Sequence, residues 1–306
     1  MTPERVVAVT GATGFVGCAL REEAAKQGIA LRALTRRDQP ETPGVEWVRG
    51  DLHDRGALAG LVAGTEAVIH VAGVVNTPDP MGFHLGNVEG TKQLIDAALA
   101  KGVGRFVFVS SLAAREPHLS RYGESKHHAE ELVAASGLDW TIVRPPAIYG
   151  PRDREIFEMF RAARWGLLPM PAGRASVIHV GDLTRLLFAL LPGGPAVRHR
   201  IFEPDDGRAG GWSHAELARA IGAAVGRKVF VPQLSKRLLT GAAGLDRLVR
   251  GDKARLTPDR VGYMAHPDWV STPAHAVPPE FWTPWIATPD GLKATAQWYR
   301  EHGWLR

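Results

Sequence analysis

The sequence predicts an α/β protein built on a doubly wound parallel sheet, with a smaller α/β cap towards the carboxyl end. Three observations lead to this expectation. Short β-branched segments alternate with longer helical patterns in the first half, several of these segments are apolar almost throughout, and the rhythm changes after Gly150. Strands that are apolar on both faces are typical of a parallel sheet covered by helices on both sides.

The alternating segments give the order of elements in the first half. Strands are expected at Val6–Thr10, Ala30–Thr35, Glu46–Arg49, Ala67–Val71, Arg105–Ser110 and Asp139–Arg144. Helices are expected between them at Gly14–Gln27, Arg55–Val62, Val88–Lys101 and Tyr122–Ser136. We therefore expect one domain over residues 1–150, completed by segments near 175–204.

The remainder, residues 151–306, predicts a cap made of several insertions rather than an independent module. Ser213 and Glu216 have the spacing of a capping box at a helix start. Helices are expected at Ile156–Trp165, Leu183–Leu191, Ser213–Val225, Leu234–Val249 and Pro289–His302, and strands at Ala175–His179, His199–Pro204 and Val229–Val231.

Composition excludes several classes of protein. The chain has 306 residues, of which 45% are hydrophobic and 23% charged, as in a folded globular domain. The net charge of +5 is scattered, so nucleic-acid binding is not expected. No apolar run is long enough to predict a membrane span. The single cysteine, Cys18, cannot form an internal disulfide, which favours a reducing compartment and a cytoplasmic location.

A glycine-rich loop follows the first expected strand and opens the first helix. It reads Thr10-Gly-Ala-Thr-Gly-Phe-Val-Gly17, with glycines at 11, 14 and 17. Glycine permits positive φ and a close backbone approach, and a helix N-terminus attracts anions. The loop therefore predicts a dinucleotide site, with a purely structural turn as the alternative. The expected cofactor contacts here are Thr10, Gly11, Thr13, Gly14, Phe15, Val16 and Gly17.

The ends of the next strands refine the nucleotide prediction. Arg36 and Arg37 follow the second strand, where an acidic residue would suit NAD and an arginine suits a 2′-phosphate. We therefore expect NADP(H), with NAD(H) as the alternative. Asp51 is interpreted equally as an adenine contact or as a helix N-cap. The further expected cofactor contacts are Leu52, which packs on the adenine, and Val71, Ala72 and Gly73 after the fourth strand.

A tyrosine and a lysine one helical turn apart form the expected catalytic pair. Tyr122 and Lys126 lie on one face of a helix. A nearby ammonium favours the phenolate, which would bring a tyrosine into the range of acid–base catalysis. Lys126 can also bind the nicotinamide ribose, so both residues are expected to contact cofactor. Ser110 and Ser111 supply a hydroxyl at the end of the fifth strand.

These motifs together resemble the extended short-chain dehydrogenase/reductase family, of the epimerase/dehydratase type, over nearly the whole chain. The resemblance implies a Rossmann fold and makes Ser111 the catalytic serine. It implies that Asn87 supports a proton-relay water, although a helix cap is the alternative. It also implies that the segment containing Pro145, Ala147 and Ile148 runs along the nicotinamide face.

The resemblance further implies hydride transfer to or from a carbon bearing oxygen, with Tyr122 as acid or base, Lys126 tuning it and Ser111 orienting the substrate oxygen. Leu112 and Ala113 stand where sugar-nucleotide dehydratases carry an acidic pair. The chain is therefore more similar to the branch of 3β-hydroxysteroid dehydrogenases and dihydroflavonol reductases, which act on bulky apolar substrates.

The substrate side is less defined by the sequence. Candidate substrate contacts are Ser111, Tyr149, Trp282 and Trp285, where the two tryptophans either line an apolar cleft or fasten their loop. No metal site is expected, because no His, Cys and carboxylate cluster has ligand spacing. We expect an apolar small-molecule substrate, and a homodimer is compatible with the family resemblance. The alternative functions are a nucleotide-sugar epimerase and a non-catalytic NADP-binding redox sensor or assembly protein.

Overall fold

A seven-stranded parallel sheet forms the centre of the first of two units into which the chain divides. The computed structural model describes residues 6–251 and 257–305. The first unit comprises Met1–Arg144 and Leu183–Phe202, and the second comprises Pro145–Asp182 and Glu203–Arg306.

The strand order in the first unit is β11-β6-β5-β4-β1-β2-β3, and the order reverses between β1 and β4. Open α/β sheets bind their ligands beyond the carboxyl ends of the strands at such a switch point. The bounds are β1 Val6–Thr10, β2 Ala30–Thr35, β3 Val45–Arg49, β4 Ala67–His70, β5 Arg105–Val109, β6 Asp139–Val143 and β11 Arg200–Phe202.

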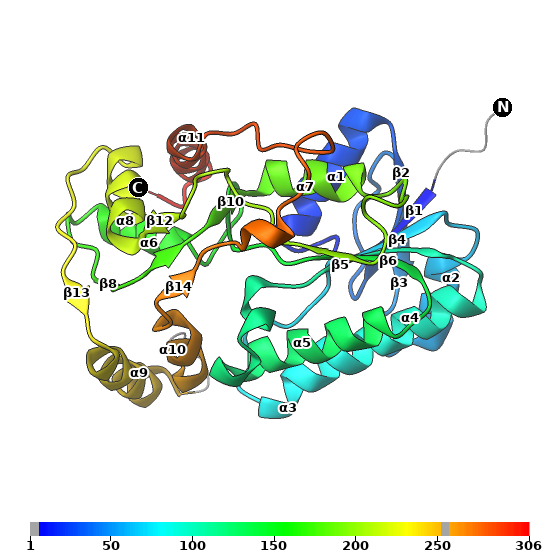
Figure 1. The fold of residues 1–306 in the computed structure, drawn as a ribbon, viewed down its shortest axis with the longest axis horizontal. Coiled ribbons are helices and arrows are strands. Elements are labelled where there is room, and N and C mark those ends of the chain that lie inside the picture. Colours follow the sequence, from blue (N-terminus) through cyan, green and yellow to red (C-terminus); the bar gives the residue numbers. More distant parts are fainter. Residues whose placement is uncertain (1–5, 252–256, 306) are drawn as a thin grey trace. The chain divides into compact units, whose positions relative to one another are not determined.

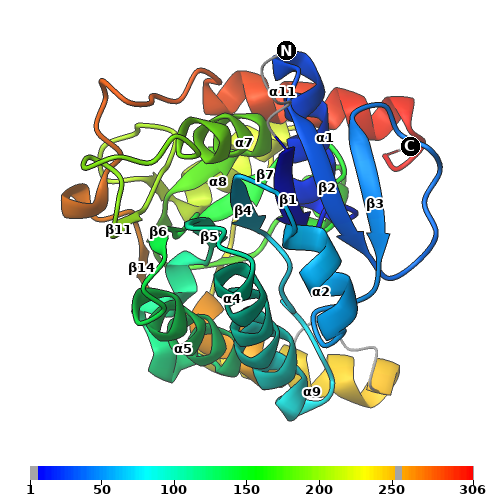
Figure 2. The same ribbon diagram turned by 90° about the vertical axis from the view of Figure 1, so that its right-hand side faces the viewer.

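Helices cover both faces of this sheet (Figures 1 and 2). One face carries α1 (Phe15–Gln27) and α7 (Val180–Ala189), and the other carries α2 (Arg55–Val62), α4 (Gly90–Ala100) and α5 (Arg121–Ala134). Leucine, valine and alanine side chains of α2, α4 and α5 pack on β4, β5 and β6 in one buried core. Shorter pieces are α3 (Pro80–Phe83), the π-helix His84–Glu89, and 3₁₀ helices at Leu112–Arg115 and Pro117–Leu119.

The predicted doubly wound parallel sheet is confirmed. The ends of most predicted elements in this unit lie within a residue or two of the observed ends. The helix predicted over Val88–Lys101 is wrong at its start, because it begins as the π-helix His84–Glu89 and becomes α-helical only at Gly90. Such wide turns are rare and are frequent at functional sites.

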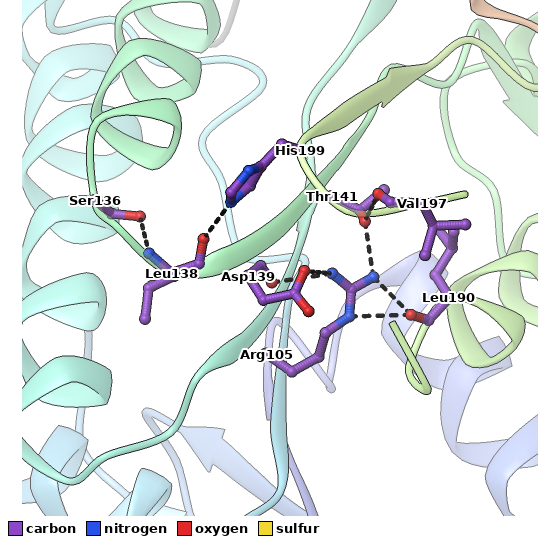
Figure 3. Close-up of polar contacts among 8 residues, drawn as sticks. All are labelled: Arg105, Ser136, Leu138, Asp139, Thr141, Leu190, Val197 and His199. Carbon is purple, nitrogen blue, oxygen red and sulfur yellow. Dashed lines mark hydrogen bonds and ion pairs between the residues drawn. The ribbon is translucent and has the colours of Figure 1, made fainter. Parts of the chain in front are cut away.

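A buried arginine of β5 links β6 to the residue that follows α7 (Figure 3). Arg105 Nε and Nη2 donate to the Leu190 carbonyl at 3.1 and 2.6 Å. Its Nη1 donates to Asp139 Oδ1 at 3.0 Å and its Nη2 to Thr141 Oγ1 at 2.7 Å. Thr141 Oγ1 in turn donates to the Val197 carbonyl at 2.6 Å. Burial lowers the pKa of Arg105, and the Asp139 carboxylate opposes that shift.

Short strands and five helices build the second unit in the residues that the structure describes. β7 (Ala147–Tyr149) pairs with β10 (Val177–His179), and β9 (Arg174–Ala175) lies between β12 (Trp212–Ser213) and β14 (Asp268–Trp269). β8 (Met170–Pro171) pairs with β13 (Gln233–Leu234). The helices are α6 Phe157–Ala163, α8 His214–Ala224, α9 Lys236–Arg250, α10 Pro258–Met264 and α11 Thr288–Glu301, with a 3₁₀ helix at Pro273–His275.

Predictions for this unit are confirmed mainly where they concern helices. The capping box of Ser213 and Glu216 is present at the start of α8. The single strand predicted at Ala175–His179 is wrong, because β9 and β10 pair with different partners on either side of Ser176. The strand predicted at Val229–Val231 is also wrong: Phe230 makes an isolated bridge, and β13 begins after Pro232, which has no N–H to donate. None of the described helices is long and apolar enough to cross a membrane.

Candidate active site

The glycine-rich loop folds as a tight turn between β1 and α1. Gly11 has φ +75°, and a Cβ there would lie 2.7 Å from the Ala72 backbone nitrogen. A Cβ at Gly17 would lie only 2.1 Å from the Gly11 carbonyl oxygen. Gly14 caps α1 without a side-chain hydrogen bond, so the helix begins with backbone N–H groups directed at the loop. This arrangement fits a phosphate, because only glycine leaves room and the helix N-terminus attracts anions.

The end of β2 is basic, as its sequence indicates. Arg36 and Arg37 are exposed. Arg49 Nη1 donates to Asp38 Oδ1 at 2.6 Å, so the nearby acid is already paired. Among residues 6–251 and 257–305, the Arg36 guanidinium has no side-chain partner, which leaves it available for an anionic group of a ligand.

Asp51 does not cap the following helix, so that interpretation is wrong. Asp54 is the N-cap of α2, and its Oδ1 accepts a hydrogen bond from Ala57 N at 2.9 Å. Asp51 Oδ1 instead accepts from His53 N at 2.8 Å in the turn before α2. Leu52 lies against Gly90, where an added Cβ would meet its Cδ1 at 2.7 Å.

The segment after β4 brings the nucleotide loop and the catalytic helix close together. Val71 N donates to the Thr10 carbonyl at 3.3 Å, and Ala72 N donates to Thr10 Oγ1 at 3.2 Å. A Cβ at Gly73 would lie 3.1 Å from Asn87 Oδ1 and 3.8 Å from Lys126 Nζ. Gly73 is therefore the point at which the predicted nucleotide site and two of the predicted catalytic residues meet.

Helix α5 positions the catalytic pair. Ser120 is the N-cap of α5. Gly123 allows the first turn of α5 to pack closely against the segment after Ser111, because a Cβ at Gly123 would lie 2.7 Å from the Ala113 carbonyl oxygen. Tyr122 is half-buried, and its ring lies 6.2 Å from that of Phe83.

Lys126 is 4% exposed. Its Nζ donates to the Val109 carbonyl at 2.9 Å and lies 4.3 Å from the centre of the Phe108 ring. Burial lowers the pKa of Lys126 from 10.5 to about 8, while the Glu130 carboxylate opposes the shift. The ammonium is therefore charged at neutral pH but is held in an apolar surrounding.

The two serines at the end of β5 have different partners. Ser110 Oγ donates to Glu130 Oε1 at 2.5 Å. Glu130 is buried and also accepts from Arg144, whose Nη2 lies 2.6 Å from Oε2. Ser111 Oγ accepts only a weak contact of 3.2 Å from Ala113 N among the described residues, so its proton is free for a ligand. Sequence reasoning missed Glu130, although its spacing of four from Lys126 was a signal.

Asn87 lies in the π-helix His84–Glu89 and not at a helix end, so its interpretation as a cap is wrong. Its Oδ1 accepts from Val74 N at 2.6 Å, and its Nδ2 donates to the Val74 carbonyl and to Ser125 Oγ, both at 2.9 Å. Ser125 Oγ donates to the Tyr122 carbonyl at 2.8 Å. Asn87 thus connects the segment after β4 to the helix that carries Tyr122.

His70 extends this connection to the nucleotide loop and was not identified from the sequence. Its Nδ1 lies 2.6 Å from Thr10 Oγ1 and its Nε2 lies 2.9 Å from Thr91 Oγ1. Thr91 Oγ1 donates to the Asn87 carbonyl at 2.6 Å. Burial, with a smaller effect from the Lys126 ammonium, lowers the pKa of His70 to about 3, so the ring is neutral.

The remaining predicted site residues belong to the second unit. Pro145 precedes β7, which contains Ala147, Ile148 and Tyr149. Tyr149 is 1% exposed and lies in the apolar core of this unit, and burial raises its pKa. Trp282 is 8% exposed and Trp285 is 75% exposed. These placements favour a structural role for Tyr149 and leave Trp285 as the accessible tryptophan of the two.

The tryptophans of the terminal helix and tail fasten the chain to the core of the second unit. The Trp304 ring lies 5.3 Å from that of Trp298 and 5.7 Å from that of Tyr299. Phe157 of α6 lies 5.4 Å from Trp304 and 4.8 Å from Tyr299. Trp298 and Trp304 are therefore packing residues of this unit.

Comparisons with known proteins agree with this geometry. A family model described as NAD(P)H-binding matches residues 11–159. The chain is 39% identical over 317 residues to a ceramide reductase of Caulobacter vibrioides, covering 98% of this chain and 96% of that protein. It is 33% identical over 189 residues to a 2-alkyl-3-oxoalkanoate reductase of Stenotrophomonas maltophilia, covering 53% of this chain and 57% of that protein. It is 29% identical over 276 residues to a 3-beta-hydroxysteroid dehydrogenase of Mycolicibacterium neoaurum, covering 76% and 74%.

Solved structures show the same fold. The crystal structure of gox2253 matches with a TM-score of 0.79 and 25% identity, covering 99% of this chain and 100% of that one. MoeE5 in complex with UDP-glucuronic acid and NAD matches with a TM-score of 0.70 and 20% identity, covering 97% and 99%. With the glycine-rich loop at the switch point and reductases among its relatives, the chain belongs to the extended short-chain dehydrogenase/reductase family and is an enzyme that uses a nicotinamide cofactor.

Proposed function

We propose that this enzyme uses NADPH to reduce a ketone of a long-chain amide lipid related to ceramide to the secondary alcohol. The relative named ceramide reductase supports this, because the alignment runs through nearly the full length of both chains. A ceramide contains a secondary hydroxyl next to the carbon that bears its amide nitrogen. The corresponding ketone is the form that a hydride can reduce.

One observation carries the proposal. Lys126, which lies one helical turn after Tyr122 in α5, meets Asn87 at Gly73, next to the predicted nucleotide site. The loop Thr10–Gly17 would hold the cofactor pyrophosphate, and Lys126 would bind the nicotinamide ribose. The bound reduced nicotinamide supplies the hydride. The Ser111 hydroxyl orients the substrate oxygen, and the Tyr122 hydroxyl donates its proton to that oxygen as the alcohol forms.

The preference for NADPH rests on Arg36. A guanidinium matches a phosphate with two parallel hydrogen bonds, and such charge-assisted bonds are stronger than neutral ones. Arg36 is exposed, and the acid nearby in sequence, Asp38, is paired with Arg49. These features support recognition of a 2′-phosphate at this strand end.

An apolar substrate is supported by the segment between β4 and α4. Val75, Met81 and Leu85 are large apolar side chains that this segment exposes. It also contains Phe83, whose ring packs beside Tyr122. An apolar surface beside the catalytic tyrosine suits acyl chains better than the hydroxyl-rich surface of a sugar nucleotide.

Isotope transfer tests the proposal directly. The protein is incubated with NADPH deuterated at the transferring position of C4 and a short-acyl 3-oxo ceramide analogue, with Tyr122→Phe as the matched control. One deuterium in the alcohol product, absent with the variant, supports the proposal. Turnover confined to UDP-sugars would make the protein an epimerase. Cofactor binding without turnover of any substrate would make it a sensor or an assembly protein.

A further inference from the structure

An exposed apolar patch lies on the second unit where α6 ends. Trp165 is 84% exposed, Leu167 46% and Phe230 69%. Leu167 and Phe230 are partners in a parallel bridge, and Phe230 N donates to the Gly166 carbonyl at 2.8 Å. Bridge partners place their side chains on the same side of the chain pair. We call Trp165, Leu167 and Phe230 the bridge patch.

Basic residues adjoin the bridge patch. Arg227 and Lys228 are exposed and precede Phe230 by two to three residues. The Lys228 carbonyl oxygen lies 3.5 Å from the position of a Cβ on Gly166, so the two segments run side by side. Neither segment, 161–168 or 226–231, contains an aspartate or a glutamate. The surface is therefore both apolar and positively charged.

This combination fits a lipid surface better than a protein partner. Tryptophan is enriched at the level of the lipid headgroups, and basic residues are attracted to anionic lipids. Protein interfaces, in contrast, are depleted of lysine in their cores. Large apolar side chains that insert between headgroups are removed from water at a surface that also attracts the neighbouring charges.

We propose that the bridge patch docks the enzyme on a membrane surface that contains anionic lipids, which brings the enzyme to the membrane in which a lipid substrate is dissolved. The need for such docking rests on the proposed function, since a lipid substrate resides in a bilayer. The docking itself depends only on Trp165, Leu167, Phe230, Arg227 and Lys228.

Vesicle flotation tests the docking surface. The full chain is mixed with vesicles of phosphatidylcholine alone or with added phosphatidylglycerol. We expect binding to the anionic vesicles, and a loss of about tenfold or more in the double variant Trp165→Ser/Phe230→Ser. Arg227→Gln/Lys228→Gln should abolish the preference for anionic lipid. Leu99→Ser, an exposed leucine of the first unit, is the matched control and should bind like the native chain.

Tryptophan emission gives an independent readout. The difference in emission between the native chain and Trp165→Phe should shift to shorter wavelength when anionic vesicles are added, because Trp165 leaves water. Unchanged flotation of Trp165→Ser/Phe230→Ser, or no binding by the native chain, would overturn the proposal. If light scattering gave the variant a different molar mass from the native chain, the patch would be assigned to contacts between copies of the chain. That result would also overturn the proposal.

Activity on a water-soluble, short-acyl substrate separates this proposal from the proposed function. The Trp165→Ser/Phe230→Ser variant should turn over that substrate like the native chain and should be slower, by about tenfold, only when a long-chain substrate is embedded in vesicles. Vesicle binding through the patch without turnover of any ketone would refute the proposed function alone. Native turnover without vesicle binding would refute the docking surface alone.

Discussion

Replacing Lys126 with methionine should make the protein more stable and inactive at the same time. Burial lowers the pKa of Lys126 from 10.5 to about 8, which corresponds to about 3 kcal/mol of unfavourable burial of the charge. Methionine has a similar length and no charge, and Arg144 keeps Glu130 paired in the variant. After the lost hydrogen bond to Val109 is subtracted, we expect the free energy of unfolding at pH 7 to rise by about 1–3 kcal/mol.

The pH dependence separates the burial of charge from a packing effect. Below about pH 8, Lys126 is protonated in both the folded and the unfolded chain. Between pH 8 and 10.5 the folded chain has lost this proton while the unfolded chain keeps it, so the stability of the native protein rises with pH. Integrated from pH 7 to pH 10, this rise is about 2–3 kcal/mol. The advantage of Lys126→Met should shrink by that amount.

Urea unfolding of both proteins across this pH range measures the difference. Lys92→Met is the matched control, because Lys92 is exposed and pairs with Asp96 on the surface of α4. Its stability should differ from that of the native protein by less than about 0.5 kcal/mol at every pH. A Lys126→Met variant that is less stable than the native protein at pH 7, or a stability difference that stays constant from pH 7 to pH 10, would show that burial of the Lys126 charge does not destabilise the fold.

Three further predictions concern the glycine-rich loop, Arg36 and Arg105, and two of them include a comparison variant. Gly17→Ala should weaken cofactor binding by at least about tenfold and lower the free energy of unfolding by about 1–3 kcal/mol. Both effects should be smaller in Gly14→Ala, because a Cβ there would lie 3.3 Å from its nearest neighbour. Cofactor and denaturant titrations of the two variants measure these differences. Arg36→Ser should raise the KM for NADPH by about 10- to 100-fold and leave that for NADH nearly unchanged. Arg105→Met should lower the free energy of unfolding by about 2–4 kcal/mol in denaturant titrations, and Asp139→Asn should lower it by less. If Arg105→Met were as stable as the native protein, the contacts of Arg105 in Figure 3 would not stabilise the fold.

Features that depend on neighbouring residues could be predicted from the sequence. The loop at 10–17 requires glycine for local steric reasons, and the buried strands of the first unit have a clear apolar pattern. The capping box of Ser213 depends on a spacing of three residues along one helix. In each case the interaction that forms the structure is contained in a short stretch of sequence.

Features that depend on contacts between distant segments could not be predicted. The hydrogen bonds of His70 to Thr10 and Thr91 join residues 60 and 21 positions apart in the chain. Glu130 is recognisable as a partner of Ser110 only once β5 and α5 are packed together. The two-residue strands of the second unit are too short for a pattern of alternating side chains. Their pairing depends on which distant segments of the chain lie next to each other in the fold.

The proposed function requires that Tyr122 donates the proton in a carbonyl reduction by NADPH. It is tested most directly by the kinetics of Tyr122→Phe with the 3-oxo ceramide analogue, followed at the nicotinamide absorbance band, with NADPH affinity measured by fluorescence on the same samples. We expect kcat to fall by about 10²- to 10⁴-fold while the Kd for NADPH changes by less than about threefold. A kcat within about tenfold of the native value, with the substrate still reduced, would contradict it.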